Sequence, residues 1–145
     1  MKIGIISDTK NAAIKDELMA YVKSIGHEPI DLNKHSGILE NCDELVNAYN
    51  SHSIDRGLAI DDWGIITFMY LAKNKGIVVA EINDEHSARM TTEHNNSSIL
   101  TFGSEISTIN QMKRMVDKFL AAKYEGGRHK VRIDMMDTLL EKEGK

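Results

Sequence analysis

Two arginines near the C-terminus have the type and spacing of an anion clamp. Arg128 and Arg132 stand four residues apart in EGGRHKVRIDMM, so a helix would place them on one face. Two guanidinium groups side by side can hold a phosphate through paired, charge-assisted hydrogen bonds. The alternative is a solvated basic face with Asp134 and Glu125 as salt-bridge partners, and spacing alone favours that alternative.

A second group of residues, EHNN, could transfer protons. His94 can exchange a proton near neutral pH, and the neighbouring amide of Asn95 could hold a hydroxyl group or an oxyanion. The alternative is a histidine at a helix end that contacts the last carbonyl groups, with Asn95 as the C-cap. The other histidines show no metal-ligand spacing, so we expect no metal site from His27, His35, His52, His86 and His129.

Three aspartates follow two apolar runs that are typical of strands. Asp8 comes after KIGIIS, and Asp61 and Asp62 come after RGLAI. Together they would repel a phosphate, although they could attract a cation, as in a phospho-acceptor receiver domain. That class needs a Ser or Thr after the fourth strand and a Lys after the fifth, where this chain has Asn83-Asp84 and Gly103-Ser104. We therefore expect the three aspartates to cap the helices that follow them.

Strands and helices alternate along the whole chain. This order predicts an α/β fold with a single doubly wound, five-stranded parallel sheet (Rossmann-like) and a C-terminal helical extension. We expect one domain over residues 1–145, with an arm from about residue 126, where two glycines form a hinge. Ligands would bind at the carboxyl ends of the first and third strands. The expected strands are 2–7, a short edge strand at Pro29, 56–60, 77–82 and 98–102; the expected helices cover 14–25, 39–49, 68–71, 85–95, 109–120 and 128–141.

Composition excludes several classes of protein. The chain has 145 residues, 41% of them hydrophobic, and a formal net charge of −4, which argues against a nucleic-acid-binding protein. No apolar run is long enough for a membrane helix, and the N-terminus does not have the pattern of a signal peptide. Cys42 is the only cysteine, so it cannot form an internal disulfide, and we expect it in the core. These features predict a soluble, cytoplasmic protein.

Two segments carry a resemblance to a known family. SARMTTEHNNSSILTFGSEI and FLAAKYEGGRHKVRIDMM resemble the ribose/galactose-phosphate isomerases of the ribose-5-phosphate isomerase B type, and the resemblance covers nearly the whole chain. In this family the histidine of the His-Asn pair assists opening of the sugar ring, and two arginines bind the substrate phosphate. The resemblance therefore implies ring opening by His94 and substrate binding by Asn95, Arg128 and Arg132, with no metal or organic cofactor.

The chain also departs from the family pattern. Active homomeric members carry Cys-Gly-Thr-Gly-x-Gly after the third strand, where the cysteine is the base and the glycines hold the oxyanion. This chain has DDWGII at that place, and Ile65 stands where another branch of the family uses a glutamate base. Of the family's Asp-His pair after the first strand, only Asp8 remains. Asp61 could replace the base only if burial raised its pKa toward the working pH.

The resemblance implies that the catalytic site needs two chains. Sites of this family are built across a subunit interface. The absence of the cysteine base and of the loop glycines in this chain is similar to the pattern in the A-type chain of the galactose 6-phosphate branch. We therefore expect one component of a heteromeric aldose-ketose isomerase that interconverts galactose 6-phosphate and tagatose 6-phosphate. Its partner would be a homologous, cysteine-containing chain of the B type. The alternative is a non-catalytic, homo-oligomeric protein of the same fold that binds sugar phosphates.

Overall fold

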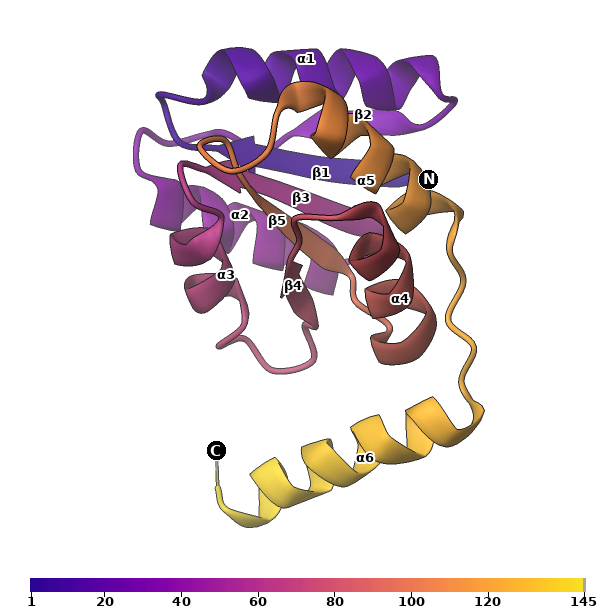
Figure 1. Cartoon of the computed structure of the whole chain (residues 1–145). Coiled ribbons are helices and arrows are strands. Elements are labelled where there is room, and N and C mark those ends of the chain that lie inside the picture. The colour runs from indigo at the N-terminus through magenta and orange to yellow at the C-terminus, as the bar shows by residue number, and fades with distance from the viewer. Residues whose placement is uncertain (145) are drawn as a thin grey trace.

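The computed structural model describes residues 1–144, in which a parallel sheet lies between two layers of helices (Figure 1). The strands are β1 (Lys2–Ser7), β2 (Glu28–Asp31), β3 (Arg56–Asp61), β4 (Val79–Glu81) and β5 (Ile99–Gly103). The helices are α1 (Ala12–Ser24), α2 (Ile38–Asn50), α3 (Ile65–Leu71), α4 (Glu85–Asn95), α5 (Ile109–Ala121) and α6 (Gly127–Lys142). The predicted alternation of strands and helices is confirmed.

The sheet has the order β2-β1-β3-β5-β4, with every neighbouring pair parallel. After β1 the chain adds β2 on one side of it and then β3 on the other. The strand order therefore reverses between β1 and β3, which is the predicted switch point of a doubly wound sheet. The aspartates that follow these two strands lie at this edge, as expected.

Alternating side chains along the strands build a core on each face of the sheet. Ile5, Ile60 and Phe102 pack against α1, α4 and α5 on one face. Ile6 and Ile99 pack against α2 and α3 on the other. Figure 1 shows α1 and α5 on one side of the sheet and α2 and α3 on the opposite side. Cys42 is fully buried in the second core, as predicted, and burial raises the pKa of its thiol to about 12.

Two elements show how local geometry sets the bounds of strands and helices. The strand expected over 77–82 is only the three residues of β4, which pairs with β5 alone at the edge of the sheet. An edge strand has a partner on one side, so fewer hydrogen bonds hold its ends. By contrast, α1 ends as predicted, because Gly26 takes a φ of +87° directly after the C-cap.

The last helix leaves the body of the protein. An extended segment after α5 leads to α6, which runs below the sheet and contacts α4 (Figure 1). Arg56 fixes the start of this segment, since its guanidinium group donates to the carbonyl oxygens of Phe119 and Ala122. No helix within residues 1–144 has both the length and the apolar character to cross a membrane.

Candidate functional site

The structure brings together the four residues that the resemblance selects. His94 and Asn95 end α4, and Arg128 and Arg132 lie in the first turns of α6. The guanidinium group of Arg132 donates to Oδ1 of Asn95 at 3.1 Å, which ties the two helices together. Side chains from two distant stretches of the sequence therefore form one cluster on the surface.

Local backbone geometry places this cluster. Asn96 takes a left-handed conformation, with a φ of 56°, and its N–H donates to the last carbonyl groups of α4. Asn96 is thus the C-cap, and the alternative in which Asn95 caps the helix is wrong. The Asn95 side chain instead faces α6. Gly126 and Gly127 both have positive φ values, 65° and 54°, and turn the chain into α6 at a point where other residues would be strained.

The two arginines do not form the salt bridges with Asp134 and Glu125 that the alternative interpretation names. Asp134 pairs with Lys130 at 2.5 Å, and Glu125 lies near His129 instead. Within the described part of the chain, neither Arg128 nor Arg132 has a carboxylate within ion-pair distance, and both are exposed. Cationic groups without carboxylate partners attract anions, so the clamp interpretation is favoured over the alternative.

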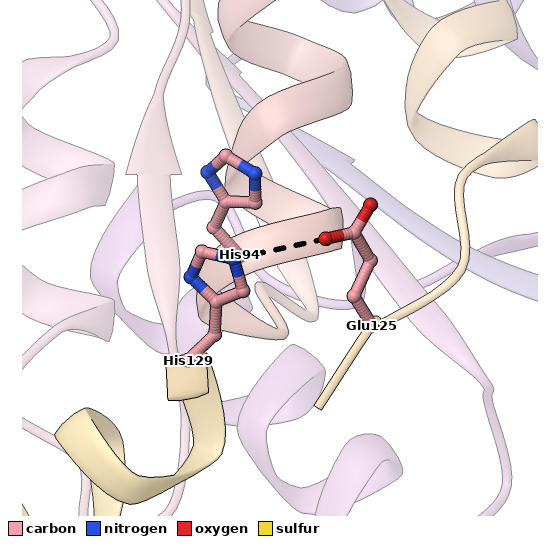
Figure 2. Close-up of side chains that lie close together, drawn as sticks. All are labelled: His94, Glu125 and His129. Atoms are coloured by element: carbon pink, nitrogen blue, oxygen red, sulfur yellow. Dashed lines mark ion pairs between the residues drawn. The ribbon is translucent and has the colours of Figure 1, made fainter. Parts of the chain in front are cut away.

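A second histidine, which the sequence analysis left without a role, completes the cluster. The ring of His129 stacks on that of His94, with centroids 4.1 Å apart and planes 8° from parallel (Figure 2). His129 is 8% exposed, and its Nε2 lies 3.6 Å from Oε2 of Glu125. Burial is the main cause that lowers the pKa of His129, and electrostatic repulsion from His94 and the two arginines adds to it.

The same cluster has the composition of a metal site but not the geometry. Donor atoms of His94, Glu125 and His129 lie within 4.8 Å of one another. A metal ion bonds to an imidazole nitrogen in the plane of the ring, where the lone pair points. Because the two rings are stacked face to face, one ion cannot lie in both planes. The cluster is better suited to an organic anion that the arginines can reach.

The carboxylates at the carboxyl edge of the sheet have structural roles. Asp61 is 3% exposed and accepts four hydrogen bonds, from the N–H groups of Trp63, Gly64 and Thr67 and from the Thr67 hydroxyl, at 2.6–3.0 Å. Asp8 accepts from the N–H and the side-chain amide of Asn11 at 2.9 Å. Asp61 thus bonds to a first-turn N–H of α3, as predicted, whereas Asp8 only holds the turn before α1 and accepts no hydrogen bond from an N–H of that helix, which differs from the prediction. Since both oxygens of Asp61 are occupied, it is not available as a base.

Asp62 differs from the prediction, because its carboxylate contacts side chains of another loop instead of a helix terminus. It forms an ion pair with Lys10 at 2.9 Å, and its other oxygen accepts from the Asn11 side chain at 3.1 Å. The hydrogen bond from Lys10 lowers the pKa of Asp62. Lys10 lies 52 positions earlier in the chain, so only the folded sheet brings the two together.

Beside these carboxylates lies an open, mainly apolar groove of about 880 Å³. Trp63, which is 56% exposed, lines it together with Ile65, Ile66 and Met69. The backbone N–H groups of Trp63 and Gly64 donate to Asp61, so they are not available to an oxyanion. Gly64 is present, but its backbone is packed closely against β5, since a Cβ at this position would lie 2.9 Å from the carbonyl carbon of Phe102. The groove does not have the chemistry of a sugar-phosphate site.

Replacing Asp61 by alanine should destabilise the protein strongly. The change leaves several buried N–H donors without an acceptor, each of which costs about 1–3 kcal/mol. We expect a loss of about 3 kcal/mol and a drop in Tm of roughly 6–10 °C in thermal unfolding. Asp62→Ala is the matched control, since it removes the ion pair with the exposed Lys10 and one side-chain hydrogen bond from Asn11 but leaves no buried backbone N–H without an acceptor, so it should lower Tm much less than Asp61→Ala. Equal Tm values for the two variants would contradict the structural role of Asp61.

The two sets of residues lie at opposite edges of the sheet. His94 comes just before β5, which begins at Ile99, whereas Asp61 pairs with Gly103, where β5 ends. A strand rises about 3.3 Å per residue, so the steps along β5 between these edges span roughly 13 Å. One chain therefore cannot bring its own arginine clamp to its own switch point.

Comparison with known proteins agrees with this geometry. The family model described as Ribose/Galactose Isomerase matches residues 3–136. The galactose-6-phosphate isomerase subunit LacA of Clostridium acetobutylicum is 41% identical over 142 residues, covering 97% of this chain and 100% of that protein. The LacA protein of Streptococcus mutans is 36% identical over 141 residues, covering 96% and 99%.

Solved structures give the same result for the fold. Ribose-5-phosphate isomerase B of Clostridium thermocellum superimposes with a TM-score of 0.91 at 31% identity, covering 98% of this chain and 99% of that one. The resemblance that EHNN and GGRHKVR suggested is thereby confirmed. The chain belongs to the ribose/galactose isomerase family.

Proposed function

We propose that this chain is the phosphate-binding and ring-opening component of a heteromeric isomerase acting on galactose 6-phosphate and tagatose 6-phosphate. The observation that carries the proposal is the contrast between the two edges of the sheet. One edge has the cluster of His94, Asn95, Arg128 and Arg132, and the switch point at the other edge has an apolar groove lined by Trp63. The sequence similarity to LacA proteins over nearly the whole chain supports the choice of hexose 6-phosphates.

The proposed partner is a homologous chain with an intact cysteine loop. Its switch point would face the arginines of this chain, so that one complete site forms from two incomplete ones. The exposed surface of α6 supports such a contact, because Val131, Met135 and Leu139 recur every four residues and each is about 60% exposed. An apolar stripe of this kind on a protruding helix is typical of a protein interface.

The reaction would proceed through an open-chain sugar. His94 would give a proton to the ring oxygen as the bond between that oxygen and the anomeric carbon breaks, and the anomeric hydroxyl would lose its proton to solvent water as the carbonyl group forms. The partner's base would then take the proton from C2, producing a cis-enediol(ate), and return it to C1. As C2 becomes the carbonyl group of the ketose, the proton of its hydroxyl group would pass from O2 to O1, so that no net proton is gained or lost. Asn95 would bind a substrate oxygen, while Arg128 and Arg132 would hold the phosphate.

The proposal is tested by co-expression with a homologous chain that carries the cysteine loop. The purified complex should interconvert galactose 6-phosphate and tagatose 6-phosphate, and should be much less active on ribose 5-phosphate. A complex whose partner lacks the cysteine is the control and should be inactive. A stable homo-oligomer that binds sugar phosphates, does not associate with the partner and has no activity would favour the non-catalytic alternative.

A further inference from the structure

The catalytic cluster contains an aromatic contact that the proposed function does not use. His94 is only partly buried, yet one face of its ring is covered by the ring of His129 (Figure 2). The two residues come from different helices, so the stack forms only when α6 is docked on α4. A stacked neighbour restricts the angles that a terminal imidazole can take, because leaving the stack loses the contact between the rings.

His129 is buried beside an anchored segment of the backbone. Its Nδ1 is buried without a hydrogen-bond partner among residues 1–144, while its Nε2 faces Oε2 of Glu125 at 3.6 Å. The backbone N–H of Glu125 donates to the carbonyl oxygen of Glu93 at 2.9 Å, which anchors this segment directly beside His94. The buried ring of His129 thus forms a platform on which the ring of His94 lies.

We infer that His129 is a positioning residue, whose ring sets the orientation of His94 for ring opening. The inference rests on the proposed role of His94. Proton transfer needs the donor nitrogen about 2.6–3.2 Å from the sugar oxygen, and a displacement of about 1 Å can cost roughly a hundredfold in rate. A partly exposed histidine without a platform would spend most of its time outside that range. The stacking of the two rings, rather than a hydrogen bond of His129, restrains the orientation of the His94 ring.

Two substitutions separate stacking from other roles. His129→Ala removes the platform, and we expect kcat of the heteromer on galactose 6-phosphate to fall about ten- to hundredfold, with KM changed less than about threefold. His129→Phe keeps an aromatic face and gives up no hydrogen bond at Nδ1, so kcat should stay within about threefold of the unmodified enzyme. His86→Ala, at an exposed position in the first turn of α4, is the matched control and should leave kcat unchanged.

A measurement that needs no activity tests the same contact. In NMR spectra of the chain without its partner, the ring protons of His94 should shift clearly in His129→Ala, which lacks the ring current, and much less in His129→Phe. If the heteromer proves inactive while this pattern holds, the proposed function fails but the stack stands. Unchanged His94 shifts in His129→Ala, full kcat in that variant, or a His129→Phe enzyme as slow as His129→Ala would each overturn the inference.

Discussion

Purified alone, this chain should isomerise galactose 6-phosphate at least ~10³-fold more slowly than the heteromer. General acid–base catalysis contributes about 10²–10⁴ to a rate, and removal of one oxyanion donor costs about 10²–10³. The switch point of the chain offers neither, because Asp61 accepts four hydrogen bonds, two of them from the N–H groups of Trp63 and Gly64, and because Trp63 and Ile65 stand at the positions of the family's glycine-rich loop. Any site assembled from two copies would therefore have a phosphate clamp but no base.

The measurement is a coupled assay of ketose formation by the chain, by its partner and by their mixture at equal concentrations. A host isomerase carried through purification would give false activity, so Arg128→Ala/Arg132→Ala prepared in the same way serves as the background. Activity appearing only on mixing supports a composite site. Turnover by the chain alone that is comparable to the mixture and absent from the double variant would contradict it, and would show that the switch point is catalytic after all.

Much of the site could be predicted because it follows from local sequence. Any helix brings Arg128 and Arg132 onto one face, because they are four residues apart. The helix α4 ends within the polar EHNN segment, at Asn95. The alternation of strands and helices predicts a parallel sheet. Because the carboxyl ends of parallel strands share one edge, Asp8 and Asp61 lie at that edge. In each case a regular repeat or a short turn determines the geometry.

The features that sequence analysis missed depend on contacts across the fold. The stack of His94 on His129 joins two separate helices, and the ion pair of Asp62 with Lys10 spans 52 positions. His129 follows Arg128 directly, and no spacing in the sequence identifies His94 as its partner. The sequence alone therefore shows His129 only as one residue of the GGRH segment. The sequence did predict local hydrogen-bond donors for the aspartates, which Asp61 and Asp8 have, but it could not identify Lys10 as the partner of Asp62.

Arg128→Ala and Arg132→Ala should each weaken substrate binding by about ten- to hundredfold. Each change removes a charge-assisted hydrogen bond to the phosphate, worth about 1.5–3 kcal/mol. The phosphate lies far from the reacting carbons, so the clamp should hold ground state and transition state alike, and the loss should appear mainly in KM. His94→Ala should behave oppositely, lowering kcat by about 10²-fold or more with a small change in KM.

Steady-state kinetics of the three heteromers, after gel filtration has confirmed assembly, separate these roles. Lys130→Ala is the matched control, because it removes a positive charge from the same helix at a residue that pairs with Asp134 instead of facing Asn95. Simple loss of positive charge would raise KM in all three cationic variants, whereas a clamp raises it only for the two arginines. If KM and kcat are unchanged in both arginine variants, α6 has a solvated basic face, and the composite site loses its phosphate ligand. If kcat instead falls with KM unchanged, the arginines act mainly on the transition state, and the phosphate must be anchored elsewhere.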